Sequence, residues 1–472
     1  MSTAIADRAS TIFEEDPRVE KASRPGFLSN LTAVLGGQLS CAIVALLVQA
    51  CYARLLGPAG RGQISLCLMV TAFGVLVGGL GGDYPLTIWT AESREKSAEW
   101  LPAIGWTSIS GSFLATCLWF LVYWKWSPSF LKGMTSRMAV VVLISIPLSI
   151  LFTYLMAILT GLEWFRLRSG LALSNQITGL MGIGLLVSLF GAQPEIALMG
   201  FQLGLLVCAI VTAALLRNFL RNACTLRVSA RRVYSVLSLG LRGQLGNLAT
   251  FFNYRLDVFV VNYFFDTTQV GLYAVGVLVA EGLWQIPHAA ALALFPRTAR
   301  TLNRGATQFT CLVIRQVLLV ACLSGATMAL VSPWVIPLVF GARFAPSVPV
   351  IWWILPGTIA LSVSKVICAD LAGRGRPEFS SICAFLSLAV TISLDLLLIP
   401  RMGINGAALA STAAYSVQTV VLAVFLKRQL LVSWKSLLVP SFDEFAFYQL
   451  AWLRFKARLW PDSAPLVPPW SN

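Results

Sequence analysis

Residues 240–300 read GLRGQLGNLATFFNYRLDVFVVNYFFDTTQVGLYAVGVLVAEGLWQIPHAAALALFPRTAR, which predicts two apolar helices joined by a short polar turn, DTTQ. Four ionisable residues interrupt these helices: Arg255, Asp257, Glu281 and His288, the last being the only histidine in the chain. An ionisable side chain at the centre of a bilayer costs from about 3 to above 10 kcal/mol. We therefore expect these residues to have specific partners or a function that offsets this cost.

The composition places most of the chain in a membrane. Its 472 residues are 57% hydrophobic and 12% charged, and the mean hydropathy is +0.78. Soluble domains carry roughly 25% charged residues. The net charge is +15, but Lys and Arg fall mainly between apolar runs, which favours anionic lipid headgroups over nucleic acid as partners. The ten cysteines are scattered, mostly within apolar runs, and we interpret them as small buried hydrophobes.

A transmembrane helix needs about 20 largely apolar residues. Twelve stretches meet this requirement: 31–55, 64–83, 101–124, 139–160, 171–190, 196–216, 241–264, 271–295, 309–332, 347–371, 379–399 and 405–426. Lys and Arg gather before the first stretch, after every second stretch and in the C-terminal tail. Since positive charge marks cytoplasmic segments, both termini are expected in the cytoplasm.

Short matches between the two halves indicate an internal repeat. LGGQL at 35–39 matches LRGQL at 241–245, and the pairs Gly161/Gly373 and Gly191/Gly403 have equal spacing. We expect an all-α integral membrane protein, with twelve transmembrane helices in two six-helix lobes related by a parallel repeat around a central cavity. The expected parts are a cytoplasmic arm (1–30), an N-terminal lobe (31–216), a basic cytoplasmic linker (217–240), a C-terminal lobe (241–426) and a cytoplasmic amphipathic tail (427–472).

Two polar stripes are expected to line that cavity. At 100° per residue, Gln38 and Gln49 lie nearly in register on the first predicted helix. The corresponding stripe on the seventh helix is Gln244, Arg255 and Asn262, in which Arg255 is the counterpart of Gln49. Two lobes that face each other would bring both stripes to one space.

Of the remaining ionisable positions, Glu281, His288 and Lys365 allow two interpretations. Glu281 and His288 share one face of the eighth helix, as either a proton or cation relay or a buried pair that fixes helix packing. Lys365 is either a second cavity cation or a side chain that snorkels to the interface. Asp257 lies about 200° around the helix from Arg255, so we expect it to contact a neighbouring helix of its own lobe.

The sequence offers no recognisable enzyme site. It has no Walker loop, dinucleotide fingerprint or metal-ligand cluster, so no catalytic activity, cofactor or metal is expected. Ser362 and Lys365 match S-x-x-K only within a predicted helix, without S-D-N or K-T-G. A membrane glycan polymerase or ligase is the enzymatic alternative, but the longest predicted external loop, around Lys125–Arg137, has only about a dozen residues to hold an acceptor sugar.

Several stretches resemble the bacterial polysaccharide (O-antigen-type) flippases of the multidrug/oligosaccharidyl-lipid/polysaccharide exporter superfamily. They are ARLLGPAGRGQ (53–63), RLD (255–257), VGLYAVGVLVAEGLWQIP (270–287), FGARF (340–344), LAGRGRPE (371–378) and IPRMGINGAALAS (399–411). The resemblance implies a two-lobed carrier that flips a polyprenyl-pyrophosphate-linked oligosaccharide to the outer leaflet by alternating access. It also implies that cavity arginines hold the pyrophosphate, and Arg255 occupies a suitable place, with Lys365 as a second candidate. The first predicted helix departs from a cationic cavity, since it offers Gln38 and Gln49 there.

The resemblance further implies a monomer in the bacterial inner membrane that serves O-antigen or exopolysaccharide biosynthesis. Its partners would be the lipid-linked oligosaccharide, membrane lipids and a glycan polymerase or ligase. A multidrug-type, cation-coupled exporter of the same superfamily is the alternative within transport.

Overall fold

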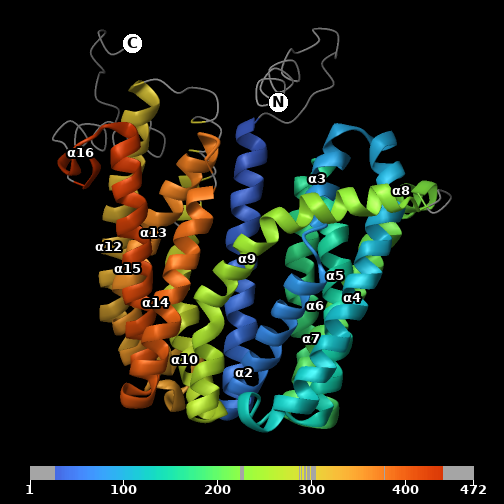
Figure 1. The fold of residues 1–472 in the computed structure, drawn as a ribbon. Helices are drawn as coiled ribbons and strands as arrows, with labels where there is room; N and C mark the ends of the chain where they lie inside the picture. Colours follow the sequence, from blue (N-terminus) through green and yellow to red (C-terminus); the bar gives the residue numbers. More distant parts are fainter. Residues whose placement is uncertain are drawn as a thin grey trace, which may run out of the picture.

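The computed structural model describes residues 27–223, 228–285, 304–376 and 378–438, together with positions 287, 288, 290, 291, 294 and 298. Within these residues all regular structure is helical (Figure 1). Nine of the described helices are long and apolar enough to cross a membrane. An all-helical membrane fold is therefore confirmed. The expected amphipathic tail helix, beyond residue 438, and most of the cytoplasmic arm lie outside the described residues.

The helices of the first half follow one another closely. They are α2 (Phe27–Gly78), α3 (Asp83–Glu92), α4 (Arg94–Phe130), α5 (Ser136–Gly161), α6 (Phe165–Phe190), α7 (Pro194–Leu215) and α8 (Arg217–Ala223). The short helices α3 and α8 were not predicted. Helix α8 and the start of α9 occupy the segment expected as a linker.

The second half has two 3-10 turns among its helices. The elements are α9 (Ala230–Phe264), α10 (Thr267–Glu281), η1 (Gly282–Trp284), α12 (Arg304–Phe340), η2 (Ala342–Phe344), α13 (Ser347–Gly373), α14 (Glu378–Met402), α15 (Ile404–Leu430) and α16 (Trp434–Leu438). Every predicted stretch overlaps one of the described helices. The total of twelve spans and the internal repeat stay predictions, since α10 has only 15 residues and α2 runs through two predicted stretches.

Helix α2 contains a break that sets where its second segment begins. Gly57 has φ 68° and ψ −175°, which is outside the helical region, and Pro58 follows it. Glycine tolerates a positive φ, and proline is favoured at the first position of a helix. The second segment of α2 therefore begins near residue 58, earlier than the predicted residue 64, and Arg61 lies in its first turns.

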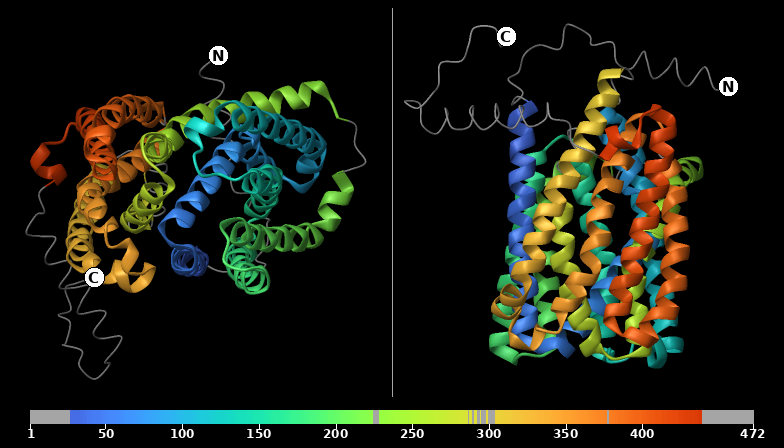
Figure 2. Two further views of the ribbon diagram at one scale, coloured as in Figure 1. Left: turned by 90° about the horizontal axis from the view of Figure 1, so that it is seen from below. Right: turned by 90° about the vertical axis from the view of Figure 1, so that its left-hand side faces the viewer.

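The helices form two groups that meet along α2, α9 and α10. Helices α2 and α4 to α7 pack on one another, as do α9, α10 and α12 to α15. The N-terminal part of α9 runs across the top of the first group before the helix turns down into the second (Figures 1 and 2). We call the end of the molecule near α3 and α8 the upper end, and the end with the α4–α5 loop the lower end.

At the lower end the two groups touch through backbone. A Cβ atom on Gly62 of α2 would overlap the carbonyl oxygen of Thr267, and one on Gly271 of α10 would overlap that of Pro58. Only glycine allows such a close approach of two helices.

Two basic side chains tie the groups together at the same end. Lys132 Nζ donates to the Tyr263 carbonyl oxygen at 2.6 Å, near the C-terminus of α9. Arg54 Nε donates to the Val339 carbonyl oxygen at 2.9 Å, near the C-terminus of α12. Cations are favoured at helix C-termini, where carbonyl groups lack helical partners. The structure is therefore closed at its lower end.

Candidate functional site

The predicted cavity residue Arg255 forms an ion pair with Glu281. Arg255 Nη1 lies 2.6 Å from Glu281 Oε1 and Nη2 lies 2.9 Å from Oε2. Both side chains are mostly buried, at 24% and 16% exposure. Two parallel charge-assisted hydrogen bonds fix the guanidinium plane, which is the arrangement arginine also makes with phosphate.

This pairing corrects the expected common face of Glu281 and His288. Helix α10 ends at Glu281, and the 3-10 turn Gly282–Trp284 follows. A 3-10 turn advances about 120° per residue instead of 100°, so the helical phase used in the prediction does not continue through it. Glu281 faces a cavity with Arg255, whereas His288 lines a different cavity with Lys365. A coupling role for either residue stays a prediction.

The cavity at the ion pair lies between the two helix groups and measures about 160 Å³. We call it the central cavity. Helix α2 contributes Gln49, Arg61, Ser65, Leu68 and Met69, and helices α9 and α10 contribute Arg255, Val258, Ala274, Val277, Leu278 and Glu281. Gln49 and Arg255 thus lie in one cavity, as their positions in the two halves predicted.

Arg61 is the cavity residue that the sequence interpretation missed. It is 4% exposed, and its Nη1 donates to Ser65 Oγ. Its Nε and the Gln49 Oε1 have no hydrogen-bond partner among the described residues. The cavity therefore receives an arginine from the N-terminal group, which was expected to offer Gln38 and Gln49 and no arginine. The Gly57–Pro58 pair was the signal that could have placed Arg61 inside a helix.

Unpartnered polar atoms make the central cavity suited to a polar ligand. A buried donor or acceptor without a partner costs about 1–3 kcal/mol. A molecule that offers an acceptor to Arg61 Nε would remove part of that cost. Two arginines against one carboxylate also leave the cavity with excess positive charge, so the favoured ligand is an anion.

A second polar cavity, of about 400 Å³, surrounds Lys365; we call it the Lys365 cavity. Lys365 Nζ lies 4.4 Å from the ring centroid of Trp284 and 5.3 Å from that of Tyr254. Cations are attracted to aromatic faces at such distances. The structure thus places Lys365 in the wall of a polar cavity, and its role in binding stays a prediction. Other polar side chains of the wall are Asn247, Thr250, His288, Ser364, Ser380, Ser381 and Gln418.

The remaining predicted cavity residues lie elsewhere. Gln244 Nε2 donates to the Leu76 carbonyl oxygen and so joins α9 to α2. Asn262 is fully buried on the lower part of α9, outside both cavities. Gln38 lies on α2, but its side chain is outside the described residues. Their expected role in binding stays untested.

Asp257 turns away from Arg255, as its phase on α9 predicted. Its carboxylate accepts hydrogen bonds from Tyr273 Oη of α10 and from Ser411 Oγ of α15, the latter at 3.2 Å. Both partners belong to the C-terminal helix group. The expected contact within its own lobe is therefore confirmed.

Residues 51–349 match the family model described as polysaccharide biosynthesis protein. The chain belongs to this family. The match confirms the resemblance to polysaccharide flippases seen in the sequence, and it includes Arg61, Arg255 and Glu281 but ends before Lys365. Among the described residues, no group of three or more His, Cys, Asp or Glu side chains could hold a metal ion.

Proteins of known name share sequence or fold with this family member. The probable low-salt glycan biosynthesis flippase Agl15 of Haloferax volcanii is 24% identical over 204 residues, 42% of this chain and 43% of that protein. The lipid II flippase MurJ, in an inward closed conformation, has a TM-score of 0.68 at 16% identity, over 91% of this chain and 99% of that one. An outward-facing multidrug resistance MATE family transporter has a TM-score of 0.60 at 13% identity, over 85% and 96%. The chain spans less than half the length of the curated relative, and the two structures show a shared fold.

Proposed function

We propose that the protein is a membrane transporter that flips a polyprenyl-pyrophosphate-linked oligosaccharide between leaflets by alternating access. The observation that carries this proposal is the central cavity, in which one arginine from each helix group faces a shared space. The protein belongs to the polysaccharide biosynthesis protein family, and this membership supports a glycan as the cargo. The protein acts as a carrier and not as an enzyme.

The pyrophosphate would bind Arg255 and Arg61. A guanidinium group binds phosphate oxygens through two parallel hydrogen bonds, and it stays charged when buried. In the present structure Glu281 occupies both hydrogen-bonding positions on Arg255. Pyrophosphate would therefore compete with Glu281, which holds Arg255 in position until the cargo arrives.

The central cavity is too small for the whole cargo, so the transport cycle would need steps in which the cavity opens. A water molecule occupies about 30 Å³ of liquid volume, so the central cavity of about 160 Å³ holds a pyrophosphate group but not an oligosaccharide. The sugars would extend into the Lys365 cavity, whose wall offers hydroxyl and amide groups beside two aromatic rings. Tyr254 lines this cavity and adjoins Arg255 on α9, so the two cavities are neighbours.

Opening would separate the two helix groups at one end at a time. The lower end is closed by the contact of Gly62 with α10 and by Lys132 and Arg54. We assign the lower end to the outside of a bacterial inner membrane and the upper end, where α2 begins and α16 lies, to the cytoplasm. The transported unit would then serve a polymerase or ligase of O-antigen or exopolysaccharide synthesis.

Replacing Arg255 with alanine tests this function. In a strain that lacks the native protein, Arg255→Ala should abolish surface polysaccharide and leave the lipid-linked oligosaccharide in the inner leaflet. Arg242→Ala is the matched control, since Arg242 is an exposed arginine on the same helix. Normal surface polysaccharide with the Arg255→Ala protein would contradict the proposal.

The same strain separates the alternatives. The MATE-like fold leaves a cation-coupled exporter of small molecules as the second candidate. Such an exporter predicts that deletion causes drug sensitivity with unchanged surface polysaccharide. A polymerase or ligase predicts that single repeat units accumulate in the outer leaflet.

A further inference from the structure

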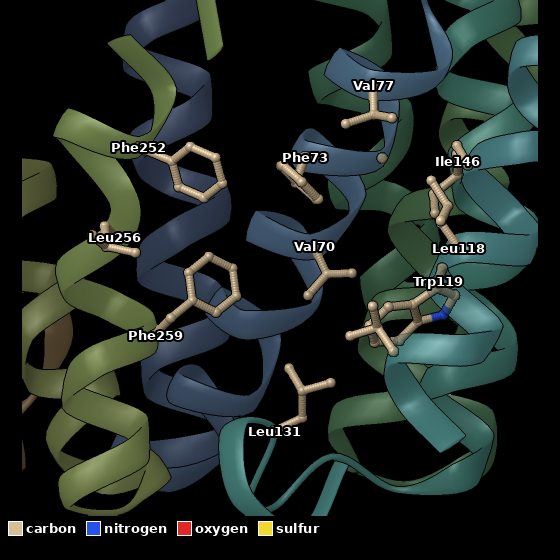
Figure 3. Close-up of a pocket in the computed structure, with 13 residues that line it drawn as sticks. Val70, Phe73, Val77, Leu118, Trp119, Leu131, Ile146, Phe252, Leu256 and Phe259 are labelled. Carbon is tan, nitrogen blue, oxygen red and sulfur yellow. The ribbon is translucent and has the colours of Figure 1, made fainter. Parts of the chain in front are cut away.

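A third cavity lies beside the central one and has a different chemical character. It measures about 560 Å³ and is bounded by α2, α4, α5 and α9 (Figure 3). Its wall consists of Val, Leu, Ile, Phe, Ala, Gly and Trp residues only. We call it the apolar cavity. Protein interiors rarely leave voids larger than a water molecule, so a space of this size requires an explanation.

The sequence of α9 sends polar and apolar side chains to different cavities. Phe252, Leu256 and Phe259 recur at the spacing of one helical face and line the apolar cavity. Arg255 lies at the edge of this face and lines the central cavity. Figure 3 shows Phe252 and Phe259 pointing from α9 toward Phe73 and Val70 of α2. The two cavities thus share α2 and α9 as walls.

The wall offers no hydrogen bond to a polar guest. Its one polar side-chain atom, Trp119 Nε1, already donates to the Ala139 carbonyl oxygen at 3.3 Å. A buried polar group without a hydrogen bond is strongly disfavoured, and a buried water needs two to four polar partners. Sugar, pyrophosphate and ordered water are therefore poor occupants, and hydrocarbon is the fitting one.

Exposed apolar side chains lie on the α4 side of this cavity. Leu118 of α4 lines the cavity and is still 42% exposed, and its neighbour Leu121 is 52% exposed on the outer surface of the same helix. On the other side, the tilted rings of Phe73 of α2 and Phe252 of α9 lie with their centroids 5.4 Å apart. The cavity therefore extends from the exposed apolar side chains of α4 to the contact of α2 with α9, and a bilayer on the α4 side would give hydrocarbon access to it.

We propose that the apolar cavity binds the isoprenoid chain of the cargo next to its pyrophosphate. This inference rests on the proposed function. A molecule with an anionic head and a long hydrocarbon chain matches two adjacent cavities, one cationic and one apolar, that share α2 and α9. The isoprenoid chain then contributes to recognition of the cargo. It lies beside the contact between the two helix groups, so a separation of these groups would release it.

Photo-crosslinking tests the occupant. Benzoylphenylalanine replaces Leu118 in the apolar cavity, Leu121 on the outer surface of α4, or Leu68 in the central cavity. The full-length proteins are reconstituted in vesicles of phosphatidylethanolamine and phosphatidylglycerol with radiolabelled polyprenyl pyrophosphate, or with radiolabelled phosphatidylglycerol as comparator. The polyprenyl label should attach at positions 118 and 68 about tenfold more than at 121.

Three other labelling results would contradict the proposal. Polyprenyl label at position 68 but not at position 118 would show that the apolar cavity does not bind the isoprenoid chain. The proposed flippase function would be unaffected by that result. Label at neither position would also overturn the isoprenoid site in the apolar cavity, while the surface polysaccharide of the Arg255→Ala strain decides the flippase function separately. Equal labelling of position 118 by phosphatidylglycerol would show a site for bulk lipid and would also overturn the inference.

Filling the cavity gives an independent measurement. Leu118→Trp should lower the rate of flipping in vesicles about tenfold, because the added ring occupies the chain site. Leu121→Trp is the matched control, since it makes the same change on the outer surface of the helix. Equal rates for the two variants would argue against the chain site.

Discussion

Arg255 and Glu281 join α9 to α10 through two parallel hydrogen bonds of 2.6 and 2.9 Å. Both terminal nitrogens of the Arg255 guanidinium group, Nη1 and Nη2, therefore donate to a carboxylate before any cargo binds. The pair lies on the wall that the C-terminal helix group presents to the central cavity. Whether this ion pair is formed or broken should decide how readily an anion binds in the central cavity.

Glu281→Gln should destabilise the empty protein and strengthen anion binding. Truncating one member of a partly buried charge pair leaves the other under-solvated and costs roughly 2 kcal/mol or more. A pyrophosphate ligand would supply the missing charge, and a ligand that binds the folded state raises its stability. The melting temperature of the variant should fall, and polyprenyl pyrophosphate should raise it by more than in the wild type.

Glu163→Gln serves as the control for that measurement, because Glu163 is exposed between α5 and α6. An equal ligand-induced shift in wild type and Glu281→Gln would show that Glu281 does not compete with the anion.

Gly62→Ala should weaken closure of the lower end. The new Cβ would overlap the Thr267 carbonyl oxygen, so α2 and α10 must move apart. Overpacking of this kind costs typically 1–3 kcal/mol, enough to shift a conformational equilibrium by about fivefold to 150-fold. Distances between spin labels on the two groups at the lower end should lengthen.

Gly184→Ala provides the comparison, since a Cβ atom on Gly184 of α6 would meet nothing within 4 Å. This variant should leave the spin-label distances unchanged. A Gly62→Ala protein with wild-type distances would show that the glycine contact does not hold the lower end closed.

The long apolar runs made most helices predictable, because a lipid environment leaves a chain few alternatives to helix. The phase of Arg255 against Asp257 was equally predictable, since both lie on one regular helix. Arg61 was missed because the helix break at Gly57 was not used to place the next helical start. The partner of Glu281 was missed because a 3-10 turn interrupts the helical phase, and because a contact between two helices depends on how they pack. Sequence spacing within one helix carries no such information.

Lys365→Met should slow flipping by weakening the binding of cargo. Lys365 stands between Trp284 and Tyr254 in the Lys365 cavity, and loss of its charge removes both cation–π contacts and the donors it offers to sugar or phosphate. Cation–π contacts contribute about 0.5–2 kcal/mol each, so the concentration of lipid-linked oligosaccharide that gives half-maximal flipping should rise about tenfold. Initial rates in vesicles measure this concentration.

Lys427→Met is the matched control for this change. Lys427 lies 5.0 Å from the ring centroid of Trp434, at the end of α15, so it loses a similar contact away from both cavities. Equal kinetic constants for the two variants would remove Lys365 from the binding site.

Cysteine labelling should place the lower end outside the cell and the upper end inside. Arg137 at the start of α5 and Arg231 at the start of α9 are both exposed and lie at opposite ends of the molecule (Figure 1). Arg137 is preferable to Lys132, whose amine holds the Tyr263 carbonyl oxygen. The native cysteines must first be replaced, since Cys322 is exposed. An impermeant maleimide should then modify Arg137→Cys in intact cells and Arg231→Cys only after permeabilisation, because basic loops are retained in the cytoplasm. Modification of both positions in intact cells would contradict the orientation on which the direction of transport depends.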